Sequence, residues 1–301
     1  MATVTFYDLI ARNKRLTYLF IFLISILFGF AGYLIVKIFN WGTAGYIFFA
    51  LFIIFYNLIL YYNSAKLILT ISNAKPADPD VYYQLHNIVE EVSIAGGIPK
   101  PKVYLMEEEF PNAFATGRSP KDACICVTTG LLRMMNREEL QGVVAHEISH
   151  IRNYDTLLMT VVAIIGGLIV LFRDLFFRSL FLFGDRRDRR RGGSEGIFLL
   201  IGIIFAILAP ILVLLIRLAI SREREYLADA SACYLTRYPR GLASALEKIG
   251  SFRGRLKTAT DATAHLFIAN PFGKDKFDFS ELFATHPPIQ KRIKRILELE
   301  I

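Results

Sequence analysis

The chain has 301 residues, of which 54% are hydrophobic and 25 are phenylalanine, and its formal net charge is +8. With a mean hydropathy of +0.41, this composition is too apolar for an ordinary soluble domain of this length. Three cysteines are too few for a closed disulfide framework, which fits a reducing compartment. Anionic lipid surfaces account for the positive charge, so no nucleic-acid partner is expected.

Two long apolar segments come first. Residues 16–36 and 41–62 carry no charge, and each is long enough to cross about 30 Å of hydrocarbon as a helix. The first segment is too long for a signal peptide and no small-residue cleavage site follows it, which indicates a retained anchor. Because Arg12, Lys14 and Arg15 precede it, the positive-inside tendency places the N-terminus in the cytoplasm. Two crossings then return the chain to that side.

The next part of the chain mixes helix and strand signals. Residues 80–95 favour a helix, and the runs 102–106 and 123–128 favour strands of a small sheet. Cys124 and Cys126 alternate to one face of the second strand, where small buried hydrophobes are expected rather than metal ligands.

A short segment lies between these two strands. As an exposed edge strand it could hold an extended substrate by backbone pairing, and as an ordinary hairpin connection it has no such role. Its residues are Asn112, Ala113, Phe114 and Ala115.

The sequence His146-Glu-Ile-Ser-His150 is the most specific motif of the chain. Asn136 is a good N-cap with Glu139 three residues later, a capping-box variant that predicts a helix start just before the motif. On a helix, positions four apart share a face, so both imidazoles can reach one metal ion while Glu147 lies beside them. This pattern predicts a zinc hydrolase, with a metalloprotease as the first hypothesis.

Two more hydrophobic runs follow, at 156–172 and 196–216, separated by the basic loop 184–193. The second run is long enough to cross a membrane, whereas charged residues limit the first. An outside location of the basic loop conflicts with the positive-inside tendency. A transmembrane pair and a re-entrant hairpin therefore both remain open, with the loop itself expected to be a solvated linker.

Catalytic zinc sites take three protein ligands and leave one position for water, so a third ligand is expected downstream. Glu225 and Asp229 are four apart and share a helical face, so Glu225 could bind zinc while Asp229 accepts the free N–H of a ligating histidine. Glu223 is the competing residue, for which a solvated charge is the ordinary role. Glu225 joins the histidines only if an even number of crossings intervenes, so both hydrophobic runs cross or neither does.

These motifs resemble the HtpX-type membrane zinc metalloproteases, distant relatives of the CAAX prenyl proteases. The resemblance extends over most of the chain. Besides the two motifs above, it includes Pro111-Asn-Ala-Phe-Ala-Thr-Gly117, His150-Ile-Arg-Asn-Tyr-Asp155, and Thr285-His-Pro-Pro288 with Arg292.

The resemblance implies one Zn²⁺ per chain, bound by His146, His150 and Glu225, with Glu147 as catalytic base and Asp229 behind a ligand. It also favours a substrate contact at residues 112–115. His286 could stabilise the oxyanion, or it could cap the terminal helix.

The expected fold is an α+β membrane protein: a mainly helical, zincin-like catalytic domain with a small β-sheet and up to four transmembrane helices. Residues 1–62 form the first hairpin, 63–155 and 217–301 form the two parts of the catalytic domain, and 156–216 form an inserted hydrophobic hairpin.

The expected function is that of a multi-pass zinc endopeptidase of the cell (inner) membrane with its active site on the cytoplasmic side. By analogy with the family, its partners are the lipid bilayer and misfolded or damaged membrane proteins, as in stress-related quality control. Two alternatives are a processing protease with one defined substrate and a catalytically idle, zinc-binding membrane scaffold. The sequence does not determine the oligomeric state.

Overall fold

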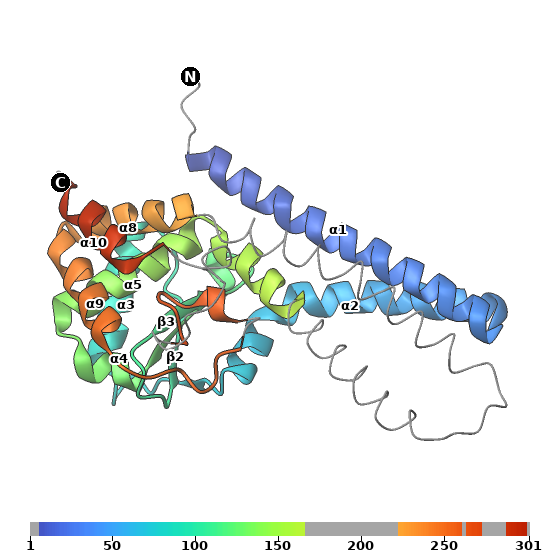
Figure 1. Ribbon diagram of the computed structural model, residues 1–301, viewed down its shortest axis with the longest axis horizontal. Helices are drawn as coiled ribbons and strands as arrows, with labels where there is room; N and C mark the ends of the chain where they lie inside the picture. Colours follow the sequence, from blue (N-terminus) through green and yellow to red (C-terminus); the bar gives the residue numbers. More distant parts are fainter. Residues whose placement is uncertain (1–5, 166–221, 261–262, 273–286, 300–301) are drawn as a thin grey trace.

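Two long helices at the start of the chain form an arm that extends away from the rest of the molecule (Figure 1). The computed structural model describes residues 6–165, 222–260, 263–272 and 287–299. Helix α1 spans Phe6–Phe39 and α2 spans Gly42–Ile71. They reverse direction at Asn40, whose φ of 53° is left-handed, a conformation that asparagine tolerates better than most residues.

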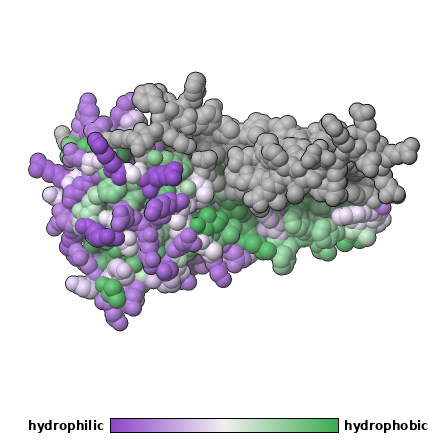
Figure 2. Space-filling view, turned by 60° about the horizontal axis from the view of Figure 1, so that its bottom comes forward, coloured by the Kyte–Doolittle hydropathy of each residue, from purple (hydrophilic) through white to green (hydrophobic). Residues whose placement is uncertain are grey.

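The arm has the surface expected of a membrane hairpin. Its candidate spans, Ile10–Lys37 and Gly42–Ile71, contain the two segments predicted from sequence, apart from Trp41 at the N-cap of α2. Large apolar side chains on it face outward, and Phe55 is 67% exposed. Figure 2 shows hydrophobic residues along the arm and hydrophilic residues over the body. The amide of Asn57 donates to Ser25 Oγ at 2.8 Å and joins the two helices.

A four-stranded mixed sheet lies in the body, in the order β1-β2-β4-β3. The predicted strands are confirmed: β2 spans Lys102–Met106 and β4 spans Cys124–Thr128, and the two are parallel. β3, Ala113–Thr116, pairs antiparallel with β4 at one edge. The short β1, Lys75–Pro76, pairs antiparallel with β2 at the other edge.

Helix α5, Arg137–Arg152, is the centre of the body, because it packs against the sheet edge β3 and against three other helices. Those helices are α3 (Tyr83–Gly96), α8 (Arg222–Thr236) and α9 (Pro239–Ser251). The backbones of α5 and α9 approach closely at Gly142, where a Cβ would lie 2.7 Å from the backbone nitrogen of Leu242. Helix α10, Ile289–Leu297, packs on α8 and α9.

Three further short helical segments belong to the described body. The first two, α4 (Thr129–Met134) and the 3-10 turn η1 (Pro120–Asp122), flank β4. The third is the 3-10 turn η2 (Ala264–Leu266), which lies against β3.

Most of the expected elements are present in the described residues. The helix predicted at 80–95 is α3, three residues shorter at its start. Cys124, Cys126 and Cys233 are buried and free, as the strand pattern indicated for the first two. A short apolar helix, Asp155–Ile165, covers the first part of the third hydrophobic run. The rest of that run, the basic loop and the run at 196–216 lie outside the described residues.

Candidate metal centre

Helix α5 begins with the predicted capping box. The side chain of Asn136 accepts from the backbone N–H of Glu139 at 2.8 Å, and the Glu139 carboxylate accepts from the Asn136 N–H at 2.9 Å. Ser244 and Lys248 of α9 also donate to Glu139, at 2.6 and 2.7 Å. The start of α5 is thus held to α9, which fixes the position of the histidines further along the helix.

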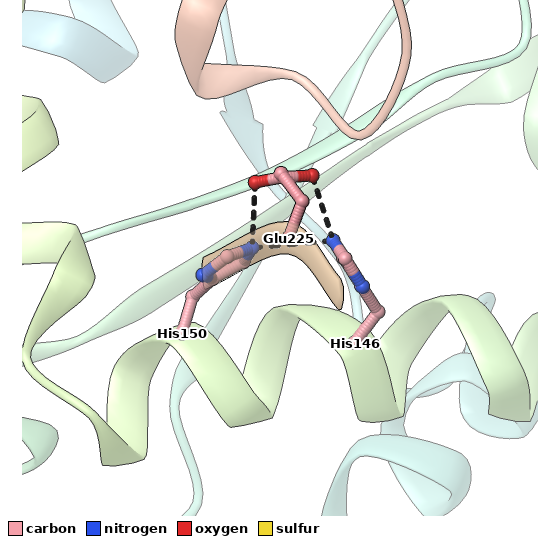
Figure 3. Close-up of side chains that lie close together, drawn as sticks. All are labelled: His146, His150 and Glu225. Carbon is pink, nitrogen blue, oxygen red and sulfur yellow. Dashed lines mark hydrogen bonds and ion pairs between the residues drawn. The ribbon is translucent and has the colours of Figure 1, made fainter. Parts of the chain in front are cut away.

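His146 and His150 point from one face of α5 toward Glu225 of α8 (Figure 3). Their Nε2 atoms are 3.2 Å apart. Glu225 Oε1 lies 3.4 Å from Nε2 of His150, and Oε2 lies 3.8 Å from Nε2 of His146. The structure therefore brings the three predicted ligands together, although they are contributed by helices far apart in the sequence. Glu223, the competing carboxylate, is exposed.

Each histidine has an aspartate behind it. Nδ1 of His146 lies 3.0 Å from Asp229 Oδ1, and Nδ1 of His150 lies 3.0 Å from Asp155 Oδ2. A proton on each Nδ1, donated to its aspartate, leaves the lone pair of Nε2 free for a metal ion. The paired carboxylates thus orient both rings toward the same point.

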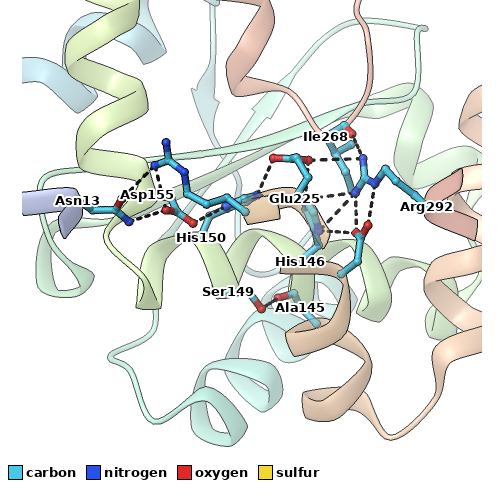
Figure 4. Close-up of polar contacts among 11 residues, drawn as sticks. Asn13, Ala145, His146, Ser149, His150, Asp155, Glu225, Ile268 and Arg292 are labelled. Carbon is cyan, nitrogen blue, oxygen red and sulfur yellow. Dashed lines mark hydrogen bonds and ion pairs between the residues drawn. The ribbon is translucent and has the colours of Figure 1, made fainter. Parts of the chain in front are cut away.

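Arg292 of α10 balances the charge of Asp229. It is 0% exposed, and its Nε and Nη2 donate to the two oxygens of Asp229 at 2.9 and 2.7 Å. Its Nη1 donates to the carbonyl of Ile268 at 2.7 Å and lies 3.6 Å from Glu225 Oε2 (Figure 4). Burial tends to raise the pKa of Asp229, but the charge of Arg292 outweighs it and the pKa is lowered. Asp229 is therefore held as a carboxylate.

The two histidines differ in charge. Burial lowers the pKa of His146 to about 4, so its ring is neutral near pH 7. Burial acts the same way on His150, but hydrogen bonds to Asp155 and Glu225 raise its pKa well above the ordinary value. Metal binding to Nε2 of His150 must then release a proton.

Glu147 lies beside the histidines and is buried. Burial raises its pKa to about 7, against the opposing charge of His150, and its carboxylate accepts a hydrogen bond from the backbone N–H of Ala115 in β3. A carboxyl group with such a pKa can both accept and donate a proton near neutral pH.

The donor set fits a zinc ion. Bonds of about 2.0–2.2 Å in a tetrahedral arrangement put neighbouring donor atoms roughly 3.3–3.6 Å apart. The three separations given above are close to that range, and all the donor atoms lie within 4.8 Å of one another. Two imidazoles and a carboxylate, with a fourth position for water, are a usual catalytic zinc set.

The predicted substrate segment lies next to this centre, but its edge is not the exposed one expected. β3 is buried throughout, and the segment after η2 pairs with part of it. Ile268 N–H donates to Ala113 O at 2.9 Å, and the ring of Phe114 packs edge-on against Phe267. The side chain of Asn112 donates to Ala269 O at 3.0 Å. Of the predicted residues, Ala115 is the one that reaches Glu147.

His286 lies outside the described residues. The sequence did not predict a role for three residues of the site. Arg292 and Asp155 belong to motifs of the family resemblance but had no assigned role, and Asn13 was not singled out. A signal for Arg292 exists, because with Ile289, Ile293 and Ile296 it forms the i, i+3, i+4, i+7 stripe of α10. An arginine within an apolar stripe indicates a buried charge that needs a partner.

A histidine pair one turn apart, a glutamate between them and a carboxylate from a second helix define a metalloprotease of the HExxH type. Residues 80–300 match the family model described as Peptidase family M48. The chain therefore belongs to peptidase family M48. With two apolar helices of spanning length, it is a membrane metalloprotease.

Curated relatives match over almost the whole chain. A "Protease HtpX homolog" of Caldanaerobacter subterraneus subsp. tengcongensis is 60% identical over 299 residues, 99% of each chain. One from Pyrococcus abyssi is 46% identical over 283 residues, 93% of each chain. Among solved structures, the crystal structure of S. mikatae Ste24p is similar at 19% identity and a TM-score of 0.49, over 95% of this chain and 66% of that one.

Proposed function

We propose that the chain is a zinc-dependent endopeptidase in which Glu147 is the catalytic base. The observation that supports it is the convergence of His146, His150 and Glu225 on one point, with the buried Glu147 beside them. When bound there, zinc acts as a Lewis acid and makes a water molecule nucleophilic near neutral pH. Glu147 takes a proton from the attacking water and passes it to the leaving amine. Asp229 and Asp155 keep the histidine rings in the ligating tautomer.

Two variants of the full chain test this proposal. The wild type and Glu147→Gln are purified in detergent, stripped of metal and loaded with zinc, and their cleavage of an unfolded protein is compared. We expect equal zinc content and a rate at least about 10²-fold lower in the variant, since general base catalysis contributes on that order. Loss of zinc in the variant would show that Glu147 is a ligand. Equal cleavage would indicate a contaminating protease or another base.

We further propose that the substrates are misfolded or damaged membrane proteins cut near the cytoplasmic face of the cell membrane, as part of a stress response. The supporting observation is the position of the site: Asn13, three residues before the first apolar segment, donates to Asp155 at 2.6 Å, and Asp155 contacts His150. At 1.5 Å per helical residue, Asn13 lies about one helical turn from the start of the first apolar segment, and Asp155 and His150 connect it to the metal centre.

A substrate survey in proteoliposomes distinguishes this role from narrow processing. We expect fragments from many unrelated membrane proteins, with cuts clustered close to the ends of their spans. A single cut site in a single substrate would favour a processing protease. Zinc binding without cleavage of any substrate would favour the idle scaffold.

A further inference from the structure

The first membrane helix contributes a side chain to the surroundings of the metal centre. Asn13 of α1 is 4% exposed, although it lies next to basic residues at the membrane end of the helix. Its amide nitrogen donates to Asp155 Oδ1 at 2.6 Å and to the carbonyl of Asn153 at 3.0 Å. Its amide oxygen accepts from Nη1 of Arg224 at 3.1 Å. Both donor hydrogens and the acceptor of this side chain are therefore in use.

The partners of Asn13 lead directly to two predicted ligands. Asp155 uses its other oxygen, Oδ2, for His150 (Figure 4). Arg224 immediately precedes Glu225 on α8, and its Nη1 also lies 3.4 Å from Asp155 Oδ1. One amide thus links α1, the turn after α5 and the start of α8. Rotation of Asp155 would move the hydrogen bond that orients the ring of His150.

The turn that carries Asp155 needs such a support. Tyr154 has a φ of 59°, a left-handed conformation that is uncommon for a residue with a bulky side chain. A conformation of this kind costs on the order of 1–3 kcal/mol and persists only where its surroundings fix it. Here α1 supplies the fixing contacts, since Lys14 Nζ lies 4.0 Å from the ring centroid of Tyr154 and Asn13 holds the residues on both sides.

We propose that Asn13 is a positioning residue of the metal centre: by holding Asp155 it holds His150 in its ligating orientation, so metal affinity depends on the docking of α1. This inference rests on the proposed function, because it takes His150 as a ligand. It makes the membrane helix a working part of the catalytic unit and not only an anchor.

The test measures metal affinity in the full chain in detergent, independently of cleavage. Zinc affinity is obtained by competition with a chromophoric chelator, and the ligand geometry by the visible absorption of bound cobalt. We expect Asn13→Ala to weaken zinc binding about tenfold, the lower end of the effect known for groups that orient metal ligands. We also expect a changed cobalt spectrum. Affinity within twofold of the wild type and an unchanged spectrum would overturn the proposal.

The matched control is Asn57→Ala. Asn57 lies on α2 of the same hairpin and donates to Ser25 of α1. Ser25 is more than three helical turns further along α1 than Asn13. This variant also loses an asparagine hydrogen bond, but one between α1 and α2 rather than between α1 and the body, and its zinc affinity should equal that of the wild type. An equal loss of affinity in Asn57→Ala would show that the arm affects the site only through general stability, which overturns the specific role of Asn13.

A double-mutant cycle separates positioning from a structural effect. If Asn13 acts through Asp155, then Asn13→Ala changes zinc affinity less than twofold when Asp155→Ala is already present. Additive losses would contradict the proposed route. Should Asn13→Ala fail to fold, Asn13→Ser replaces it under the same criteria. Unchanged metal binding in the single variant His150→Ala, compared with the wild type, would overturn the proposed function itself.

Discussion

Each half of the metal centre contains a histidine with an aspartate behind it, but the charge of the two aspartates is compensated differently. On one side, His146 is backed by Asp229, and the buried Arg292 neutralises that carboxylate with two hydrogen bonds. On the other side, His150 is backed by Asp155, which is held by the neutral amide of Asn13 and by Arg224. The Arg224 side chain is 14% exposed. The first half is a closed charge pair, whereas the second includes a contact from α1.

The difference appears in the charge of the two rings, although they lie one turn apart on the same helix. The pKa of His146 is lowered to about 4 by burial, with Arg292 opposing a proton as well. The pKa of His150 is raised because Asp155 and Glu225 outweigh its burial. The buried Arg292 behind Asp229 therefore favours a neutral His146 ring that is ready for metal, whereas Asp155, with the partly exposed Arg224, and Glu225 favour a His150 ring that holds a proton.

The largest effect should come from removing the closed charge pair. Arg292→Met leaves Asp229 buried without its cation, and breaking a buried pair in this way costs about 3–5 kcal/mol of unfolding free energy. Denaturant unfolding in detergent measures it. Lys294→Met on the same helix is the control, because its side chain is 77% exposed and should change stability by less than about 0.5 kcal/mol. Similar losses in the two variants would contradict the account of Arg292.

Replacement of each aspartate compares the two halves directly. Asp155→Asn and Asp229→Asn should each weaken zinc binding about 10- to 100-fold, because each disturbs the partner of a ligating histidine. Only Asp229→Asn should also lower the unfolding free energy markedly, since the buried Arg292 loses the carboxylate to which it donates two hydrogen bonds and keeps only Glu225 at 3.6 Å, whereas Arg224 can reach solvent. Equal stability losses would show that exposure of the arginine is not what separates the halves.

A smaller effect is the release of protons on zinc binding. Because the pKa of His150 lies well above its ordinary value and that of His146 is about 4, His150 is the charged ring and His146 the neutral ring in the metal-free protein at pH 6. Zinc binding should then release close to one proton, and zinc affinity should rise with pH until the pKa of His150 is passed. Calorimetry in buffers of different ionisation enthalpy measures this, in the Glu147→Gln background so that Glu147 does not contribute.

The same titration with Asp155→Asn sharpens the comparison. Loss of that negative charge lowers the pKa of His150, so fewer protons should be released at pH 6. A binding enthalpy that is independent of the buffer in both proteins would contradict the assigned charge of His150.

The smallest effect concerns the helix that both halves share. The pKa of Glu139 is lowered, because hydrogen bonds from Lys248, Ser244 and the Asn136 backbone outweigh its burial. The ionised Glu139 therefore contributes to the free energy of unfolding above the pKa that this carboxyl has in the unfolded chain. This contribution is lost as pH falls through its lower pKa in the folded protein. Glu139→Gln should cost about 1 kcal/mol at pH 7 and less in acid. Denaturant unfolding of both proteins as a function of pH measures this. A stability difference between the wild type and Glu139→Gln that increases as pH falls would contradict the prediction.

The parts of the molecule that sequence predicted are those set by local patterns. The capping box at Asn136 and the spacing of His146 and His150 are contained within one helix, and Glu225 was found by its own spacing to Asp229. Such patterns act over a few residues, so they can be read without knowing the fold. The apolar spans were equally clear because length alone decides them.

The contacts that sequence did not predict join distant segments. Asn13 lies beside basic residues at the end of an apolar helix, where a solvated position is the ordinary expectation, and it meets Asp155 across 142 residues. The edge of β3 was expected to be exposed because nothing in residues 112–116 indicates that Phe267 and Ile268 cover it. Pairing of this kind depends on the path of the whole chain, which no local pattern specifies.

The order of synthesis gives the position of Arg292 a further meaning. It follows His146 by 146 residues, and Asn13 precedes Arg224 by 211. A ribosome therefore releases the anchor first, the histidine helix next and the balancing arginine of α10 last. Until α10 has emerged, Asp229 lacks its cation and the His146 half of the site is unfinished. The pairing of Asp229 with its cation, and with it the His146 half of the site, is thus completed only after α10 has been synthesised.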